Sequence, residues 1–141
     1  MKIAVIGAGG VGGYFGAQLA RSGNQVSFVA RGKHFEALKQ SGLVVKSPDE
    51  AFHIDLDLVS DRVSDIENVD LIILAVKAWQ VRDIAATLKH CLIGQPMIIP
   101  LQNGVSAIDD LAEFLPRKQI FGGLCRIISR IESPGTILHS G

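Results

Sequence analysis

Four short apolar runs, each the length of one β-strand, recur along the chain with mixed segments between them. The runs cover residues 3–6, 25–30, 70–76 and 97–101. The run at 70–76 is apolar at every position after Asp70, which is typical of a parallel strand covered on both faces. Segments with helical character follow at 14–22, 35–40, 79–92 and 107–115, with Ser106 as the N-cap of the last. This alternation predicts an α/β fold with a doubly wound, mostly parallel sheet.

Further β-rich segments predict antiparallel pairs beside this sheet. They lie at residues 43–46, 52–58, 120–124, 127–131 and 136–139. The first two flank Ser47-Pro48-Asp49-Glu50 and the last two flank Ser133-Pro134-Gly135, so each couple predicts a β-hairpin, the second near the C-terminus. We expect 120–124 to form one more strand. Pro100 has no N–H for a sheet hydrogen bond, so we expect it at a strand end or a bulge.

The first apolar run leads directly into a glycine-rich turn and then a helix. Residues 7–12 form a G-x-G-x-x-G pattern and read Gly7-Ala8-Gly9-Gly10-Val11-Gly12. Gly7 permits a tight turn, Gly9 lacks the Cβ that would keep the backbone from a pyrophosphate, and Gly12 lets the helix approach the strand closely. The helix N-terminus then presents free N–H groups and its positive dipole end to the phosphates.

The context of these glycines favours a dinucleotide site over a turn with a purely conformational role. The pattern alone is weak evidence, because glycine also serves tight turns that bind no ligand. Here the helix ends at Gly23-Asn24 and a second strand follows at 25–30, which completes a βαβ unit. We therefore expect residues 1–141 to form a dinucleotide-binding domain of the Rossmann type.

The end of the second strand indicates which dinucleotide is preferred. NAD-specific sites carry an Asp or Glu roughly twenty residues beyond the glycines, which binds the ribose 2′-hydroxyl. No carboxylate occurs between Met1 and Phe35, and Arg31 and Lys33 stand where that acid would be. Arg31 can donate two N–H groups to a 2′-phosphate, and Lys33 adds a positive charge. We expect the cofactor to be NADPH or NADP⁺; the alternative is a solvated basic loop.

Length and composition limit the classes of function. The 141 residues are 48% hydrophobic, which suffices for one sizeable core and favours one domain. The formal net charge is zero, so the chain as a whole offers no electrostatic case for nucleic acid. Residues 1–48 carry six Lys and Arg against one Glu, whereas residues 49–141 carry eight against thirteen acids. The basic half is therefore the half that contains the glycine turn.

We expect no metal site, disulfide or membrane segment. Cys91 and Cys125 belong to no Cys-x-x-Cys pattern, so we interpret both as buried free thiols. The eight acids between residues 49 and 70 lack the spacing of metal ligands and are interpreted as a solvated face. The uncharged stretch 3–20 contains six glycines, which would make a poor membrane helix. We expect a cytoplasmic protein, and we assign no catalytic role to its four histidines.

Lys77 and Asn103 are candidates for the reaction centre because each follows a predicted strand. In a doubly wound sheet, ligands bind outside the carboxyl ends of the strands. A lysine near a helix N-terminus is unfavourable with the helix dipole, which indicates that Lys77 has another role. Asn103 precedes Gly104, and Asn-Gly is also a common turn pair. Position alone favours a functional Lys77 and leaves the role of Asn103 open.

The motifs of the whole chain together resemble, in order and spacing, those of the ketopantoate reductases (2-dehydropantoate 2-reductases). They are the glycine segment 7–16, Val29-Ala30-Arg31, Leu74-Ala75-Val76-Lys77-Ala78-Trp79-Gln80, Leu101-Gln102-Asn103-Gly104, Phe121-Gly122-Gly123 and Pro134-Gly135. The glycine turn alone is unspecific. The lysine after one strand, combined with Gln-Asn-Gly after the next, is quite specific to this family.

The resemblance implies NADPH-dependent reduction of a small 2-keto acid, 2-dehydropantoate, to pantoate, on the route to pantothenate and coenzyme A. It implies that residues 7–12 and Arg31 hold NADPH and that Lys77 and Asn103 contact the nicotinamide and the reaction centre. A backbone contact is implied near Ile128, within a residue or two. In the family the general acid is a lysine of a following, mostly helical domain, which also supplies most substrate contacts.

The chain resembles only the amino-terminal half of such an enzyme. We expect a fragment cut at the domain boundary, whose partner is the missing helical domain; the alternative is a natural truncation that binds NADP. The isolated chain should bind NADPH without catalysing the reduction. Two other functions stay open, namely another NADPH-dependent 2-keto acid reductase of the same plan and a non-catalytic nucleotide sensor. Arg31 argues against the sensor, since such modules usually carry an acid at that position.

Overall fold

A computed structural model describes residues 1–141 of the chain. Its larger sheet has five parallel strands in the order β5-β2-β1-β6-β7. These are β1 (Lys2–Ile6), β2 (Gln25–Val29), β5 (Leu58–Ser60), β6 (Leu71–Leu74) and β7 (Met97–Pro100). The strand order reverses between β1 and β6, and the helical segments that follow these two strands pack on opposite faces of the sheet. The doubly wound parallel sheet predicted from the sequence is confirmed.

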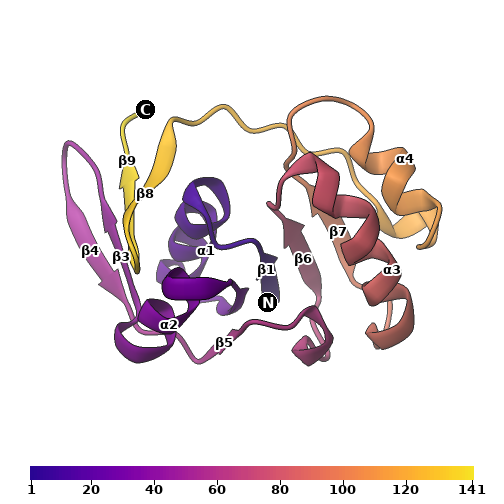
Figure 1. The fold of residues 1–141 in the computed structure, drawn as a ribbon, viewed down its shortest axis with the longest axis horizontal. Coiled ribbons are helices and arrows are strands. Elements are labelled where there is room, and N and C mark those ends of the chain that lie inside the picture. The colour runs from indigo at the N-terminus through magenta and orange to yellow at the C-terminus, as the bar shows by residue number, and fades with distance from the viewer.

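Helices cover the parallel sheet from both faces (Figure 1). They are α1 (Gly10–Arg21), α2 (Gly32–Ser41), α3 (Val81–Cys91) and α4 (Ala107–Ala112), with 3₁₀ turns η1 (Val63–Asp65), η2 (Ala78–Gln80) and η3 (Arg117–Gln119). Successive residues of β1 enter two different cores. Ile3 and Val5 pack on the side of α1, while Ala4 and Ile6 pack on the side of α3 and α4. Burial on both faces explains why the strand runs are apolar throughout.

A second sheet has four strands in the order β4-β3-β9-β8. They are β3 (Leu43–Lys46), β4 (Ala51–Ile54), β8 (Ser129–Ser133) and β9 (Thr136–His139). Both hairpins predicted from the sequence form, including the antiparallel pair near the C-terminus. They are joined by a parallel pairing of β3 with β9, in which Val45 lies opposite Ile137. Figure 1 shows this sheet beside α1, which therefore lies between the two sheets.

Helix α1 begins at Gly10, four residues before the predicted start at Tyr14. Glycine is a weak helix former, by about 1 kcal/mol relative to alanine, so local propensity did not favour extending the helix into the motif. Tertiary packing accounts for the difference. A Cβ at Gly16 would meet the ring of Phe28 in the parallel sheet, and a Cβ at Gly13 would meet Ile137 in the second sheet. The helix contains glycine because both of its faces are closely covered.

Two strand predictions were wrong. Residues 52–58 do not form one strand, because β4 ends at Ile54 and β5 begins at Leu58 in the other sheet, where it pairs with β2. The chain crosses between the sheets at Asp55 to Asp57, so a continuous β-rich segment serves two sheets. Residues 120–124 form only an isolated bridge, from Ile120 to Ile98. Beyond it Leu124 is 97% exposed, and no neighbouring strand pairs with this segment.

Several element boundaries also differ from the predictions. Helix α2 begins at Gly32 rather than at residue 35, α4 ends at Ala112 rather than at 115, and 79–92 divides into η2 and α3. Ser106 occupies the N-cap position of α4 but makes no side-chain capping bond. Cys91 and Cys125 are free thiols, as predicted, yet both are partly exposed rather than buried. Pro100 is the last residue of β7, which suits its missing N–H.

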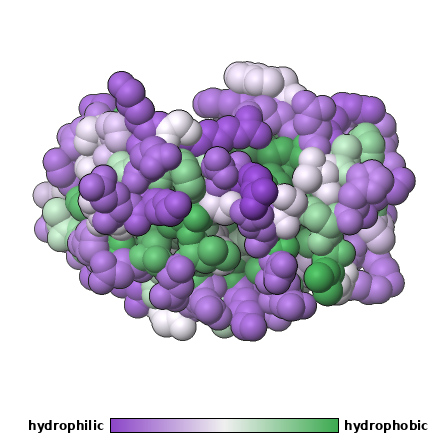
Figure 2. Space-filling view, turned by 60° about the horizontal axis from the view of Figure 1, so that its bottom comes forward, coloured by the Kyte–Doolittle hydropathy of each residue, from purple (hydrophilic) through white to green (hydrophobic).

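Hydrophilic side chains cover most of the face in Figure 2, and hydrophobic residues show mainly in its hollows. None of the helices combines the length and the hydrophobicity that crossing a lipid bilayer requires. No group of three or more His, Cys, Asp or Glu side chains has the geometry to hold a metal ion. The features that point to a ligand are therefore the cavities at the carboxyl ends of the parallel strands.

Candidate functional site

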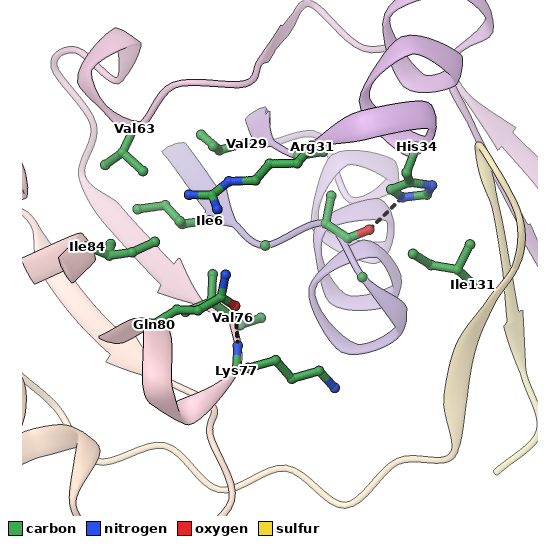
Figure 3. Close-up of a pocket in the computed structure, with 15 residues that line it drawn as sticks. Ile6, Val29, Arg31, His34, Val63, Val76, Lys77, Gln80, Ile84 and Ile131 are labelled. Atoms are coloured by element: carbon green, nitrogen blue, oxygen red, sulfur yellow. Dashed lines mark hydrogen bonds between the residues drawn. The ribbon is translucent and has the colours of Figure 1, made fainter. Parts of the chain in front are cut away.

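A cavity opens at the carboxyl ends of β1, β2 and β6 (Figure 3). We refer to it as the first cavity. Its floor and walls include Gly7, Ala8 and Gly9 of the glycine turn, Arg31 after β2, and Lys77 after β6. Three segments far apart in the sequence thus meet at one edge of the sheet, as expected for a ligand site at the point where the strand order reverses.

The glycine turn has the geometry that an anion needs. Gly7 has φ +96°, and its Cβ would lie 2.8 Å from the backbone carbon of Ala75, so only glycine fits there. A Cβ at Gly9 would meet no protein atom within 4 Å, which leaves the backbone open to the cavity. The N–H groups of Gly10, Val11 and Gly12 donate to no protein acceptor. A helix N-terminus with free N–H groups is a site for phosphate or carboxylate.

Arg31 occupies the N-cap position of α2, and its side chain extends across the first cavity (Figure 3). Its guanidinium makes neither an ion pair nor a hydrogen bond within the protein. By contrast, Arg21, Lys46 and Arg82 each lie within 2.7 Å of a carboxylate oxygen. No Asp or Glu lines the first cavity. An unpaired arginine in a cavity without carboxylates favours an anionic ligand.

A second cavity continues from the first one toward β7 and shares Ala75, Val76 and Lys77 with it. Its other lining residues include Val11, Trp79, Gln102, Asn103, Cys125 and Ile127, again without an Asp or Glu. Lys77 therefore stands where the two cavities join. Together they form one elongated crevice with the glycine turn along its side.

Two glutamines hold the backbone around Lys77, and the sequence analysis assigned a role to neither. The side-chain oxygen of Gln80 accepts a hydrogen bond from the N–H of Lys77 at 3.0 Å (Figure 3). The side-chain nitrogen of Gln102 donates to the carbonyl oxygens of Leu74 at 2.9 Å and Val76 at 3.0 Å. The position of Gln80 three residues after Lys77, at a helix start, is a local signal that could have been used. The bonds of Gln102 join two strand ends and have no such signal.

His34 is a further residue of the first cavity that the sequence analysis missed. Its Nε2 lies 2.7 Å from the carbonyl oxygen of Ala8, and its Nδ1 lies 3.0 Å from the backbone nitrogen of Gly135. Burial lowers the pKa of His34, while the hydrogen bond to Ala8 acts in the opposite direction. Both contacts reach residues distant in the sequence, so periodicity and spacing could not have indicated them.

The structure divides the predicted site residues into three groups. Gly7, Ala8, Gly9, Arg31 and Lys77 line the first cavity, and Val11, Lys77 and Asn103 line the second. Gly10 and Gly12 pack against protein instead: a Cβ would meet Ser129 in one case and the Gly7 carbonyl in the other. Ile128 lies in neither cavity, and its backbone N–H and carbonyl pair with Gly141 and Ser140. Its neighbour Ile127 and the nearby Ile131 do line the crevice.

Comparison with known proteins gives the same family from sequence and from structure. A family model described as ketopantoate reductase PanE/ApbA matches residues 3–141. An uncharacterized oxidoreductase of Bacillus subtilis, YkpB, is 36% identical over 99% of this chain and 46% of its own length. The crystal structure of 2-dehydropantoate 2-reductase from Porphyromonas gingivalis is 34% identical with a TM-score of 0.90, over 99% of this chain and 51% of that one.

A further similar structure is a ternary complex of D-mandelate dehydrogenase with NADH and anilino(oxo)acetate. It is 29% identical with a TM-score of 0.88, and the match covers 100% of this chain and 46% of that chain. The chain spans about half the length of the curated relatives it matches. The family match over nearly the whole chain and the fold shared with solved members agree with the motifs quoted above. The chain belongs to the ketopantoate reductase family of oxidoreductases.

Proposed function

We propose that this chain supplies the dinucleotide-binding half of an NADPH-dependent reductase that converts 2-dehydropantoate to pantoate. The observation that carries the proposal is Arg31, an unpaired guanidinium that lies across a cavity lined by no carboxylate. Family membership supports the reaction class. The open space over Gly9 and the free N–H groups at the start of α1 fit a pyrophosphate.

The proposal assigns a part to the glycine turn, to Arg31, and to Lys77 and Asn103. The N–H groups of Gly10, Val11 and Gly12 face the pyrophosphate, and Arg31 forks two N–H donors onto the 2′-phosphate. Lys77 and Asn103 line the second cavity, where the nicotinamide end would lie. The cofactor, when bound, supplies the hydride for the C2 ketone.

Lys77 and Asn103 provide positive charge and a hydrogen-bond donor where negative charge develops on the ketone oxygen. Gln80 and Gln102 hold the backbone from which Lys77 projects, so its position is set by the protein before the substrate arrives. The titratable groups that line the second cavity are Lys77 and the Cys125 thiol. We propose that the general acid and most substrate contacts lie in the other half of the protein, and that the isolated chain binds NADPH without turnover.

A second candidate function is reduction of a different 2-keto acid. The structure of D-mandelate dehydrogenase with NADH matches 100% of this chain and 46% of its own chain. The same half-enzyme plan therefore occurs with another substrate and cofactor. The residues that choose the acyl group would lie mainly in the other half, and a screen of the longer protein against several 2-keto acids separates these enzymes. A non-catalytic nucleotide sensor would reduce none of them. The cofactor preference, however, can be tested on this chain.

Calorimetric titration of the chain with NADPH and separately with NADH tests the cofactor proposal. We expect tighter binding of NADPH at the same ionic strength. Arg31→Ala should weaken NADPH binding by about 10- to 100-fold, the loss of a charged hydrogen-bonded contact, and leave NADH binding nearly unchanged. Lys118→Ala removes an exposed positive charge that lines neither cavity and serves as the matched control.

The possible results separate the alternatives clearly. Equal affinity for the two nucleotides, or an Arg31→Ala variant that binds NADPH like the wild type, would refute the role of Arg31. Tighter binding of NADH would favour an NADH-dependent enzyme. Turnover of 2-dehydropantoate by the isolated chain, at a rate comparable with a full-length family member, would refute the assignment of the general acid to the other half.

A further inference from the structure

The hydrogen bonds of His34 determine which of its ring nitrogens carries the proton. The backbone N–H of Gly135 donates to Nδ1 at 3.0 Å, so Nδ1 is an unprotonated acceptor. The carbonyl oxygen of Ala8 lies 2.7 Å from Nε2 and can only accept, so Nε2 carries the hydrogen. His34 is therefore a neutral imidazole of the Nε2–H form, with both of its nitrogens engaged.

These two bonds tie together three elements around the first cavity. Ala8 is the second residue of the glycine turn, His34 lies three residues after Arg31 in α2, and Gly135 is in the turn between β8 and β9. Gly135 has φ +80°, and a Cβ there would lie 3.2 Å from the Cβ of Ala37, so this turn packs closely against α2. The second sheet is thereby connected to the phosphate-binding turn through one side chain.

We propose that His34 is a positioning residue of the dinucleotide site, which holds the glycine turn through Ala8 and couples it to the second sheet through Gly135. The proposal rests on the proposed function, since the site it serves is the nucleotide crevice. His34 does not offer a free nitrogen to a ligand, so it acts on the geometry of the turn rather than on the nucleotide. His34 engages the carbonyl oxygen of Ala8, while the N–H groups of Gly10, Val11 and Gly12 at the start of α1 have no protein acceptor and are free for an anion.

Burial lowers the pKa of His34 and so favours the neutral ring, and no neighbouring carboxylate would stabilise a protonated one. The charged groups that share its cavity, Arg31 and Lys77, are both cations. On the second sheet, Glu132 is paired with Lys46 at 2.7 Å, and the other charged or titratable residues are Arg130, His53 and His139. The only charged residue of α1, Arg21, is paired with Glu50. On α2 itself, Lys33, Glu36 and Lys39 are the other charged side chains. A proton on Nδ1 would remove the acceptor that the N–H of Gly135 uses, and no carboxylate in the cavity would compensate.

The sign of the pH effect follows from the lowered pKa of His34, whose first cause is burial. The unfolded chain binds the proton at a higher pH than the folded chain does. The contribution of neutral His34 to the stability of the folded chain is therefore complete above its ordinary pKa. It is lost as the pH falls through the folded pKa. The 2′-phosphate of NADPH titrates in the same range, so the effect must be measured as a difference between variants.

Substitutions of His34 separate its two bonds. Glutamine places an N–H donor near the position of Nε2 and keeps the bond to Ala8, whereas alanine removes both bonds. We expect His34→Ala to weaken NADPH binding about tenfold and His34→Gln to bind within about threefold of the wild type. His90→Ala, an exposed histidine on α3, is the matched control and should bind normally. Circular dichroism at the titration temperature shows that each variant is folded.

Two further readouts distinguish positioning from a general structural role. Nitrogen NMR of the His34 ring in the free chain should show a protonated Nε2 and an unprotonated Nδ1. As the pH falls below the ordinary histidine pKa of about 6.5, the wild type should lose more NADPH affinity than His34→Gln, because the phosphate titration is common to both. A proton on Nδ1, or the same pH dependence in both proteins, would overturn the proposal.

The nucleotide titrations also separate this proposal from the proposed function. If the wild type binds NADPH or NADH and His34→Ala binds with the same affinity, the positioning role of His34 is refuted and the proposed function stands. A wild-type chain that binds neither nucleotide counts against the proposed function and, with it, against a positioning role at that site.

Discussion

Replacing Gly16 with alanine tests whether α1 is confined between two sheets. The added Cβ would lie 2.5 Å from Cε1 and Cζ of Phe28 and 3.0 Å from Cγ2 of Val5. Both side chains are fully buried in the parallel sheet, so the ring has no solvent into which it can move. Carbon atoms do not approach to 2.5 Å without bonding, and either the ring or the helix must shift.

Two opposing contributions set the size of the effect. Alanine is favoured over glycine within a helix by about 1 kcal/mol. Overpacking a well-filled core costs about 1–3 kcal/mol. Helix α1 cannot retreat from Phe28, because a Cβ at Gly13 on its other face would already lie 2.9 Å from Cγ1 of Ile137, which shows how closely the second sheet approaches. We therefore expect the upper part of that range and a net loss of about 1–2 kcal/mol in the free energy of unfolding.

The assay is urea unfolding followed by circular dichroism, in a double-mutant cycle with Phe28→Leu. Leucine lacks the ring atoms that meet the new Cβ, so Gly16→Ala in the Phe28→Leu background should be neutral or stabilise by up to about 1 kcal/mol. The two substitutions should thus be coupled by about 2 kcal/mol. An equal stabilisation by Gly16→Ala in both backgrounds would refute the reasoning, because only helix propensity would then be acting.

Two further substitutions separate binding from stability and test the acid dependence. Gly9→Ala should change the free energy of unfolding by less than about 0.5 kcal/mol, since its Cβ meets nothing within 4 Å, yet weaken NADPH binding in calorimetry; equal losses in both measurements would contradict this. The hydrogen bond from Ser60, assisted by Arg62, holds the pKa of Asp65 below its ordinary value. The contribution of the ionised Asp65 carboxylate to stability is therefore present above about pH 4 and lost as the pH falls through the lowered pKa. Asp65→Asn should make the free energy of unfolding less dependent on pH in this acidic range. An unchanged pH dependence would exclude this role.

Much of the fold could be predicted from local patterns, because those patterns record burial. The run at 70–76 has an apolar residue at each position after Asp70, and β6 is buried at all of its residues. The turn at Pro134-Gly135 requires a positive φ at Gly135, and the hairpin β8–β9 forms around it. The sequence also contains no Asp or Glu before residue 36, and in the structure no Asp or Glu lines the first cavity beside Arg31.

The errors arose where a residue's state depends on distant partners. Leu58 to Ser60 become β5 because β2 presents a free edge, although Leu58 itself is 44% exposed. Ile120 to Leu124 have strand-like composition, but only Ile120 finds a partner, in β7. The glycines of α1 reduce its intrinsic helix propensity, and two sheets nevertheless stabilise it.

By itself the sequence determined the alternation of strands and helices, the glycine turn and the chemistry placed after each strand. These depend on residue type and short spacing, which fix local backbone preferences and the faces that must be buried. Only the tertiary structure decided that β3 joins β9, that Lys77 stands between two cavities, and that His34 connects Ala8 to Gly135. Such contacts join residues distant along the chain, and their free energy is gained only when packing has already brought the segments together.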